Sequence, residues 1–386
     1  MTRIGMIVPS SNTALEPATM RLIADRPDIT VHFTRIPVRA ITLTAGGAAF
    51  DVETMLAAAR LLADANVDCI AWNGTAGSWL GVEYDRQVCA AITQETGIAA
   101  TTSTFAILQA CHDFGVEALA CATPYTGDVV EAISQEYAHH GLDFVGHTEW
   151  ELTDNASFAA QPDSAIADLL VSAVESGSGS SAAQAVALIC TNVDGTTVLN
   201  EVEDRLGIPV IDSIAATLWW ALELTGTDAR IPGAGLLLEQ GPLRHRAKAL
   251  VTELRERTGC DRTTVRIDEP TLGLRVDLCA AESRAQGVRS IQHDPSLDQR
   301  ALETVRWLEE HRQTLVQPTF AEPPHPPQAL RDVYGVSAQV LGPVERDGEL
   351  TAWFSAHSIA ERPWTDDDVA AMTHAQQAMT ALLKDQ

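Results

Sequence analysis

Hydrophobic and polar positions follow two alternating rhythms along roughly the first 225 residues of the chain. Apolar runs of strand length lie at 4–8, 29–33, 67–72, 116–122, 143–147, 185–190 and 208–211. Segments with the 3.6-residue period of a helix lie between them, at 14–25, 51–65, 82–95, 127–140, 164–175, 195–206 and 214–225. Strands that alternate with helices in this order predict parallel sheets with helical crossovers, so we expect an α/β fold here.

The alternation consists of one motif written twice, because landmark residues recur at matching separations. Pro9 to Gly74 spans 65 residues and Pro124 to Cys190 spans 66, while Gly97 to Ser103 and Gly207 to Ser213 each span six. In both copies an apolar strand ends in a polar turn. We therefore expect two pseudo-symmetric parallel-sheet lobes, about 1–110 and 111–225, whose strand ends meet around one cleft.

The pattern changes after a Gly- and Pro-containing stretch at 226–235. Beyond it, helices are expected near 243–258, 299–312 and 365–384, and strands near 262–268, 275–281, 335–344 and 349–357. Asp347-Gly348, between the last two strands, is a turn signal for an antiparallel hairpin. These features predict an α+β domain at 241–386 that is different in kind from the two-lobed domain at 1–240.

Composition restricts the partners of this chain. Its 26 Lys and Arg against 52 Asp and Glu give a formal net charge of −26, which repels nucleic acid and anionic membrane surfaces. No apolar stretch approaches the roughly 20 residues that cross a bilayer, and the chain begins directly with a predicted strand instead of a secretory signal. We therefore predict a cytoplasmic protein that binds neither nucleic acid nor membrane.

Seven cysteines are scattered without the paired spacing of disulfide frameworks or zinc sites, so we predict reduced thiols and no metal. One of them, Cys190, falls at the end of a predicted strand and before a predicted helix, where backbone N–H groups favour negative charge. Such a position lowers the pKa of a thiol and suits the binding of a carboxylate. The structural alternative is a cysteine in ordinary core packing. The counterpart of Cys190 in the first lobe is Gly74, which has no reactive side chain.

Polar residues at the other strand ends are candidates for substrate binding. They are Ser10 and Asn12 after the first strand, Thr75 beside Gly74, and Thr191 and Asn192 beside Cys190. Hydroxyl, amide and backbone N–H groups at these points can hold a carboxylate and stabilise an enediolate as charge develops on it. The alternative role of Asn12 is to cap the helix that follows it.

These motifs carry a family resemblance over roughly residues 3–238. Val8-Pro9-Ser10-Ser11-Asn12-Thr13, Cys190-Thr191-Asn192, Gly207-Ile208-Pro209-Val210 and Ile231-Pro232-Gly233 resemble the aspartate/glutamate racemase superfamily, on the branch of maleate cis–trans isomerases and arylmalonate decarboxylases. The resemblance implies two pseudo-symmetric α/β lobes, no cofactor, and a small dicarboxylate substrate with one cysteine from each lobe on its opposite faces. It also implies that Tyr125 hydrogen-bonds the substrate oxyanion and that Asn155 binds a carboxylate.

Two departures from that branch narrow the reaction. Isomerases typically have Cys-Thr-Ser-Gly-Ser where this chain has Gly74-Thr75-Ala76-Gly77-Ser78, and Ser-Asn-Gln where it has Ser213-Ile214-Ala215. Decarboxylases of the branch resemble this chain, because they pair a glycine in lobe one with a cysteine in lobe two. We therefore expect a cofactor-free lyase that decarboxylates a malonate-like acid through an enediolate, which Cys190 protonates from one side.

Two alternatives stay open. Maleate cis–trans isomerisation by covalent addition would use Cys190 alone, whereas racemisation would need an acid/base group on both faces. A non-catalytic dicarboxylate-binding sensor is the second alternative. A cavity open to the thiol would favour an enzyme, and a cleft filled by Trp72, Trp79 or Ile214 would favour a dead site.

The C-terminal segment carries a second resemblance. Arg362-Pro363-Trp364-Thr365-Asp366-Asp367-Asp368 is similar to the entry of the last helix of a GAF domain, a small-ligand or signalling module. This resemblance allows for a small ligand at 241–386, although no residue set identifies a chromophore or a cyclic nucleotide. We also expect the protein to form a homo-oligomer.

Overall fold

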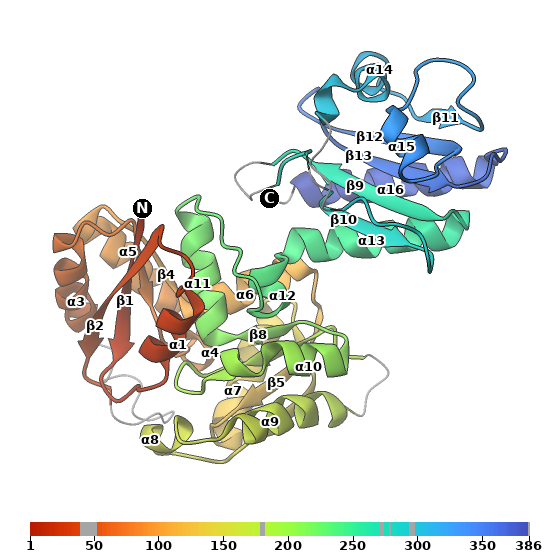
Figure 1. Ribbon diagram of the computed structural model, residues 1–386. Coiled ribbons are helices and arrows are strands. Elements are labelled where there is room, and N and C mark those ends of the chain that lie inside the picture. The colour runs from red at the N-terminus through yellow and green to blue at the C-terminus, as the bar shows by residue number, and fades with distance from the viewer. Residues whose placement is uncertain (39–51, 178–181, 270–273, 278, 293–297, 385–386) are drawn as a thin grey trace. The chain divides into compact units, whose positions relative to one another are not determined.

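The computed structural model describes residues 1–38, 52–177, 182–269, 274–277, 279–292 and 298–384 (Figure 1). The chain divides into two compact units, Met1–Pro242 and Leu243–Gln386. Among the described residues, no helix combines the length and the apolar character that a membrane span requires.

The first lobe of unit one is built on a parallel sheet of four strands in the order β2-β1-β3-β4. These strands are β1 (Thr2–Pro9), β2 (Ile29–Ile36), β3 (Cys69–Trp72) and β4 (Ala99–Thr102). Its helices are α1 (Leu15–Leu22), α3 (Val52–Asp64), α4 (Gly77–Leu80), α5 (Val82–Thr96) and α6 (Ser103–Phe114). All four residues of β3 are buried, as expected for a central parallel strand that is covered on both faces.

The second lobe repeats this plan in the order β6-β5-β7-β8, again with parallel strands. They are β5 (Ala118–Thr123), β6 (Asp143–Glu149), β7 (Ala185–Leu188) and β8 (Val210–Asp212). Its helices are α7 (Gly127–His139), α8 (Asn155–Phe158), α9 (Asp163–Glu175), α10 (Leu199–Leu206), α11 (Ser213–Leu224) and α12 (Gly235–Glu239), with a 3₁₀ turn η1 at Gly195–Thr197. Equivalent strands thus occupy equivalent places, and the predicted pseudo-symmetric α/β lobes are confirmed.

The helices that follow the last strand of each lobe join the two lobes. α6 begins at Ser103 and α11 at Ser213, and the Thr217 hydroxyl of α11 donates to the Ser103 hydroxyl at 2.8 Å. One continuous hydrophobic core runs through both lobes. This packing brings the carboxyl ends of both sheets to a shared region.

The hydrophobic rhythm misses α6 and misplaces the helix after β7. Residues of α6 such as Ala106, Ile107 and Cys111 are buried on several sides of the helix, so its sequence has no clear polar face. α10 begins at Leu199 instead of near 195, and β7 ends at Leu188 instead of 190. The predicted elements are therefore right in kind but shifted at this point, which matters for Cys190.

Unit two contains a five-stranded antiparallel sheet in the order β10-β9-β13-β12-β11. The strands are β9 (Arg262–Ile267), β10 (Ala281–Arg284), β11 (Leu315–Gln317), β12 (Ala338–Arg346) and β13 (Glu349–Ser358). The helices are α13 (Pro242–Thr258), α14 (Glu303–His311), α15 (Gln328–Asp332) and α16 (Asp366–Lys384), with a 3₁₀ turn η3 at Gln299–Ala301. The antiparallel α+β architecture predicted for this segment is confirmed.

Local differences in unit two have simple causes. The β12–β13 hairpin turns at Asp347 and Gly348, both with positive φ, as the Asp-Gly signal predicts. The strand expected at 275–281 forms only from Ala281 onward. Val276 is buried but lies outside the ladder, since its carbonyl accepts a hydrogen bond from the Arg266 side chain at 2.6 Å.

Candidate active site

A cavity of about 330 Å³ lies between the two lobes of unit one, beyond the ends of β1, β3, β5 and β7. Eight residues proposed from the sequence line it, namely Asn12, Gly74, Thr75, Tyr125, Asn155, Cys190, Thr191 and Asn192. Pro9, Val38 and Ala76 also line it, although the sequence analysis did not assign them to the site. Trp72 and Trp79, which it named as residues that would fill a dead site, line it as well. A repeat of strand ends therefore points to the right region but does not reveal the apolar walls.

Cys190 is the thiol of this cavity, and it is only 1% exposed. Its backbone N–H donates to the Ser213 hydroxyl at 3.1 Å, and that hydroxyl donates to the Leu188 carbonyl at 2.5 Å. The N–H of Asn192 donates to the Cys190 sulfur at 3.4 Å. The end of β7 and the start of α11 thus fix the cysteine in place.

The pKa of the Cys190 thiol is raised to about 11, contrary to the lowering expected from the sequence. Burial is the main cause, because it penalises the thiolate, and the charge of Asp212 adds to it. Hydrogen bonds from Tyr125 and from the N–H groups of Asn192 and Val193 act in the opposite direction. The expectation was wrong because it did not allow for the burial of the thiol; the helix expected from 195 also begins later, at Leu199. At neutral pH the group is a protonated acid.

Gly74 faces the indole of Trp72. A Cβ atom built on Gly74 would lie 2.4 Å from Cζ2 and 2.5 Å from Cε2 of Trp72, which is far inside van der Waals contact. Trp72 is fully buried, so its ring has little room to move. The indole therefore explains in physical terms why position 74 carries no side chain, and it leaves Cys190 as the one thiol that lines the described part of the cavity.

Hydroxyl groups from both lobes meet at Thr75 and Tyr125, whose oxygens are 3.0 Å apart. The Tyr125 ring contacts Trp79 and Phe158 edge to face, at 5.1 and 5.7 Å between ring centroids. Burial raises the pKa of Tyr125 well above its usual value, so the phenol keeps its proton. The Trp79 indole N–H is buried and has no hydrogen-bond partner among the residues described. Neutral donors from both lobes therefore line the cavity.

The asparagines of the site also link the lobes. The Asn12 amide donates to the Thr191 carbonyl at 2.9 Å, and its oxygen accepts from the N–H groups of Ala14 and Leu15 at 3.1 and 3.0 Å. Asn192 donates to the Asn155 carbonyl at 2.5 Å. The Asn155 amide in turn donates to the Ser11 hydroxyl at 2.7 Å. Asn12 thus hydrogen-bonds the residues that begin α1, although Ala14 and not Asn12 is the N-cap residue, and it also lies in the cavity wall.

Ser10 is the one candidate that does not line the cavity. Its side chain is exposed, and its hydroxyl accepts the Val38 N–H at 3.1 Å. Thr191 does line it, and its hydroxyl donates to the Asn73 carbonyl at 3.0 Å. The first strand end thus contributes Asn12 to the cavity wall, while Ser10 anchors the segment at Val38.

Two buried carboxyl groups near the site escaped the sequence analysis. Asp212 ends β8 and accepts the N–H groups of Ile214 and Ala215, while Asp85 of α5 accepts the Thr102 hydroxyl at 2.5 Å. Burial raises the pKa of each to about 7. Asp212 just before a helix is an N-cap pattern that the sequence does offer. Within the described residues, no group of three or more His, Cys, Asp or Glu side chains is placed to hold a metal ion.

Comparisons with known proteins agree with this geometry. The family model for arylmalonate decarboxylase matches residues 4–238, and the model for the GAF domain matches residues 242–382. The chain is 29% identical over 239 residues to arylmalonate decarboxylase of Bordetella bronchiseptica, covering 61% of this chain and 96% of that protein. It is 25% identical over 246 residues to maleate isomerase of Geobacillus stearothermophilus, with the same coverage of 61% and 96%.

Solved structures show the same similarity. A crystal structure of arylmalonate decarboxylase is 28% identical and superimposes with a TM-score of 0.52, covering 61% of this chain and 99% of that one. The maleate isomerase Iso of Pseudomonas putida S16, at 24% identity and a TM-score of 0.57, covers 62% of this chain and 99% of its own and shares the fold.

Proposed function

The chain belongs to the arylmalonate decarboxylase family over residues 4–238 and carries a GAF domain over 242–382, and from this premise we propose that unit one removes CO2 from a malonate-type diacid. Family members are cofactor-free enzymes, either decarboxylases or cis–trans isomerases. The observation that carries the proposal is the asymmetry of the cavity, which has a protonated thiol at Cys190 and no space for a side chain at Gly74.

The first step breaks the bond between the α-carbon and the departing carboxylate, which leaves as neutral CO2. The bonding electron pair moves to the α-carbon and delocalises into the retained carboxylate as an enediolate. The hydroxyls of Thr75 and Tyr125 and the Trp79 N–H are neutral donors that can stabilise this charge as it develops. The apolar walls at Pro9 and Val38 exclude water from the carboxylate that must lose its charge.

The second step transfers the thiol proton of Cys190 to the α-carbon. The S–H bond breaks, a C–H bond forms, and the resulting thiolate accepts hydrogen bonds from Tyr125 and from the Asn192 N–H before solvent restores its proton. With a pKa of about 11, the thiol still holds its proton at neutral pH when the enediolate forms. Delivery from one side gives a single enantiomer of the product.

Maleate isomerisation is the competing function, since four relatives at 22–26% identity are maleate isomerases. Covalent addition to maleate needs a thiolate, and the pKa of about 11 at Cys190 disfavours it. The third candidate is a domain that binds the diacid without turnover. The observation in its favour is that Trp72 and Trp79 occupy part of the cavity wall.

One assay separates the three functions. CO2 release from phenylmalonate and fumarate formation from maleate are measured for the wild type and for Cys190→Ala. We expect CO2 release that depends on Cys190, and no fumarate. With α-methyl-α-phenylmalonate the product should be one enantiomer. Fumarate formation that needs Cys190 would establish the isomerase instead, and binding of phenylmalonate without either product would establish the sensor.

A further inference from the structure

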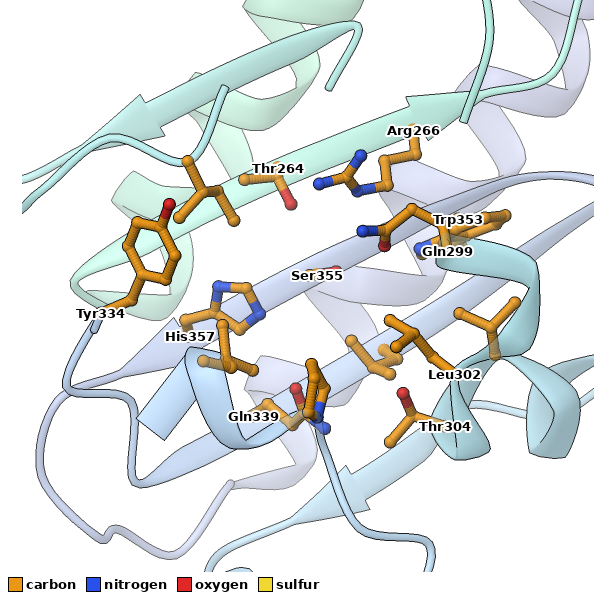
Figure 2. Close-up of a pocket in the computed structure, with 15 residues that line it drawn as sticks. Thr264, Arg266, Gln299, Leu302, Thr304, Tyr334, Gln339, Trp353, Ser355 and His357 are labelled. Atoms are coloured by element: carbon orange, nitrogen blue, oxygen red, sulfur yellow. The ribbon is translucent and has the colours of Figure 1, made fainter. Parts of the chain in front are cut away.

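A second cavity, of about 620 Å³, lies within unit two (Figure 2). It opens on the face of the antiparallel sheet opposite to α13 and α16, whose apolar residues pack with Val265 and Phe354 on the other face. Residues of η3 and α14 cover it, including Gln299 and Thr304.

Strand alternation decides which side chains face this cavity. On β9, Thr264 and Arg266 point to it, while Val265 between them points to the helices. The ladder pairs Arg266 with Trp353 and Thr264 with Ser355 on β13. Figure 2 shows these four side chains on one face of the sheet. The polar cluster is therefore a consequence of the alternating pattern in 262–267.

Arg266 is a buried cation that has little negative charge near it among the residues that the structure describes. It is 7% exposed, and its guanidinium donates to the Val276 carbonyl at 2.6 Å. No Asp or Glu among the described residues lies within ion-pair distance of it, and no described residue that lines the cavity is acidic. Arg300 of the same unit, by contrast, contacts Asp268 at 2.6 Å and Glu309 at 2.7 Å.

This shortage stands out in a chain with a net charge of −26. A buried charge is costly unless an opposite charge or several hydrogen bonds compensate it. His357 lies on the same face, and burial together with Arg262 and Arg266 holds its pKa well below the usual value. It is therefore neutral, and the lining carries one positive charge that an anion would balance.

The other residues that line the cavity favour a ligand whose remaining part is apolar. Leu302, Leu330 and Leu341 line the cavity together with the rings of Tyr334 and Trp353. Tyr334 is itself held between charged groups, because the guanidinium carbons of Arg262 and Arg289 each lie 5.4 Å from its ring centroid. A complementary ligand has one anionic end and a compact, flat, hydrophobic remainder.

We propose that this cavity binds a small aromatic monocarboxylate, with its carboxylate on the Arg266 guanidinium and its ring among Leu341, Tyr334 and Trp353. The choice of ligand rests on the proposed function, because loss of CO2 from an arylmalonate leaves an aromatic acid with one carboxylate. A diacid would bring a second charge that has no partner in the lining. Unit two thus binds the product class of unit one.

The test is calorimetric titration of the full chain with phenylacetate, phenylacetamide and phenylmalonate. Phenylacetamide has nearly the same shape as phenylacetate but no charge. We expect wild type to bind phenylacetate at least about tenfold more tightly than either analogue at a site that Arg266→Gln removes, as follows from losing a charge-assisted pair. Leu302→Trp, which fills the cavity and keeps the cation, should abolish the same site. Neither variant should change CO2 release by unit one.

Equal affinity for phenylacetate and phenylacetamide at this site in the wild type would overturn the proposal, and this comparison needs no mutant to fold. Titrations of both variants that match wild type would overturn it as well. A chain that releases no CO2 but binds phenylacetate through Arg266 would support the ligand class, while the proposed function alone would fail.

Discussion

The two cavities of this chain offer different groups to the carboxylates that we propose as their ligands. The cavity of unit one offers a thiol, hydroxyls, amides and an indole N–H, and the described residues that line it include no Arg or Lys. The cavity of unit two has the buried Arg266. Both combine apolar walls with a few polar groups, so their difference lies in formal charge.

This difference has a physical meaning. A cation beside the departing carboxylate would stabilise the charged ground state and raise the barrier to its loss as neutral CO2. Neutral donors such as Thr75 and Tyr125 instead stabilise the charge that moves to the enediolate. A site that only binds an acid benefits from a fixed cation. Under our proposals, buried charge therefore separates the site for turnover from the site for recognition.

The largest effect is expected from Cys190→Ala, which removes the acid from the neutral cavity. The rate of CO2 release should fall by about 10²–10⁴, the usual contribution of a general acid. Steady-state assays with phenylmalonate measure it, and an unchanged melting temperature shows that the fold survives. Cys111→Ala, which removes a fully buried cysteine of α6 away from the cavity lining, is the matched control. Wild-type turnover by Cys190→Ala would show that the first cavity does not use this thiol as its acid, and the contrast between a catalytic site and a binding site would then fail.

The pH dependence of the wild-type enzyme tests the protonation state of Cys190. If Cys190 acts as an acid with a pKa of about 11, activity stays level through neutral pH and declines as the pH approaches that value and the thiol loses its proton. A nucleophilic thiolate would show the reverse, with activity that rises over the same range. The pH profile of kcat between pH 6 and 10 distinguishes the two.

A smaller effect is expected from Tyr125→Phe, which removes one neutral donor and leaves the ring contacts with Trp79 in place. A hydrogen bond to a developing charge contributes about 1.5–3 kcal/mol, so kcat should fall roughly 10- to 150-fold. KM should change little if the bond forms mainly in the transition state. A variant that raises KM at unchanged kcat would assign Tyr125 to ground-state binding.

The sequence predicted the two lobes and six residues that line the first cavity because both depend on short-range patterns, while Tyr125 and Asn155 came from the family resemblance. Strand ends and their spacing place Gly74 and Cys190 without knowledge of packing. The indole of Trp72 beside Gly74 and the burial that raises the pKa of Cys190 are tertiary properties, so no local pattern reveals them. Arg266 lies between these cases. Its alternation with Val265 was readable from the sequence, but the absence of an acidic partner among the described residues was not.

A stability effect is expected from Gly74→Cys, because the new Cβ would press on the Trp72 ring. Overpacking typically costs about 1–3 kcal/mol, which lowers the melting temperature by roughly 2–12 °C in a unit of this size. Gly74→Cys combined with Trp72→Val should recover part of this loss, with Trp72→Val alone as the control. The double variant should also give a racemic product, because a second thiol reaches the opposite face. An unchanged melting temperature for Gly74→Cys would mean that the indole does not exclude a side chain.

The smallest effect concerns a buried carboxyl in unit one, which contrasts with the buried guanidinium of unit two. Burial raises the pKa of Asp85 from about 3.8 to about 7 in the folded protein. The folded state therefore holds this proton more tightly than the unfolded chain does, so the stability it contributes is complete below pH 4 and is lost as the pH rises to 7. Asp85→Asn removes this dependence, and its melting temperature should fall less between pH 5 and 8 than that of the wild type, by a few degrees.

Asp212 and Glu203, whose pKa values are also raised to about 7, keep part of the slope. Asp64→Asn on the exposed side of α3 should retain the whole wild-type slope. Parallel curves for wild type and Asp85→Asn would show that Asp85 is already charged in the fold, and that unit one, like unit two, tolerates a buried ion.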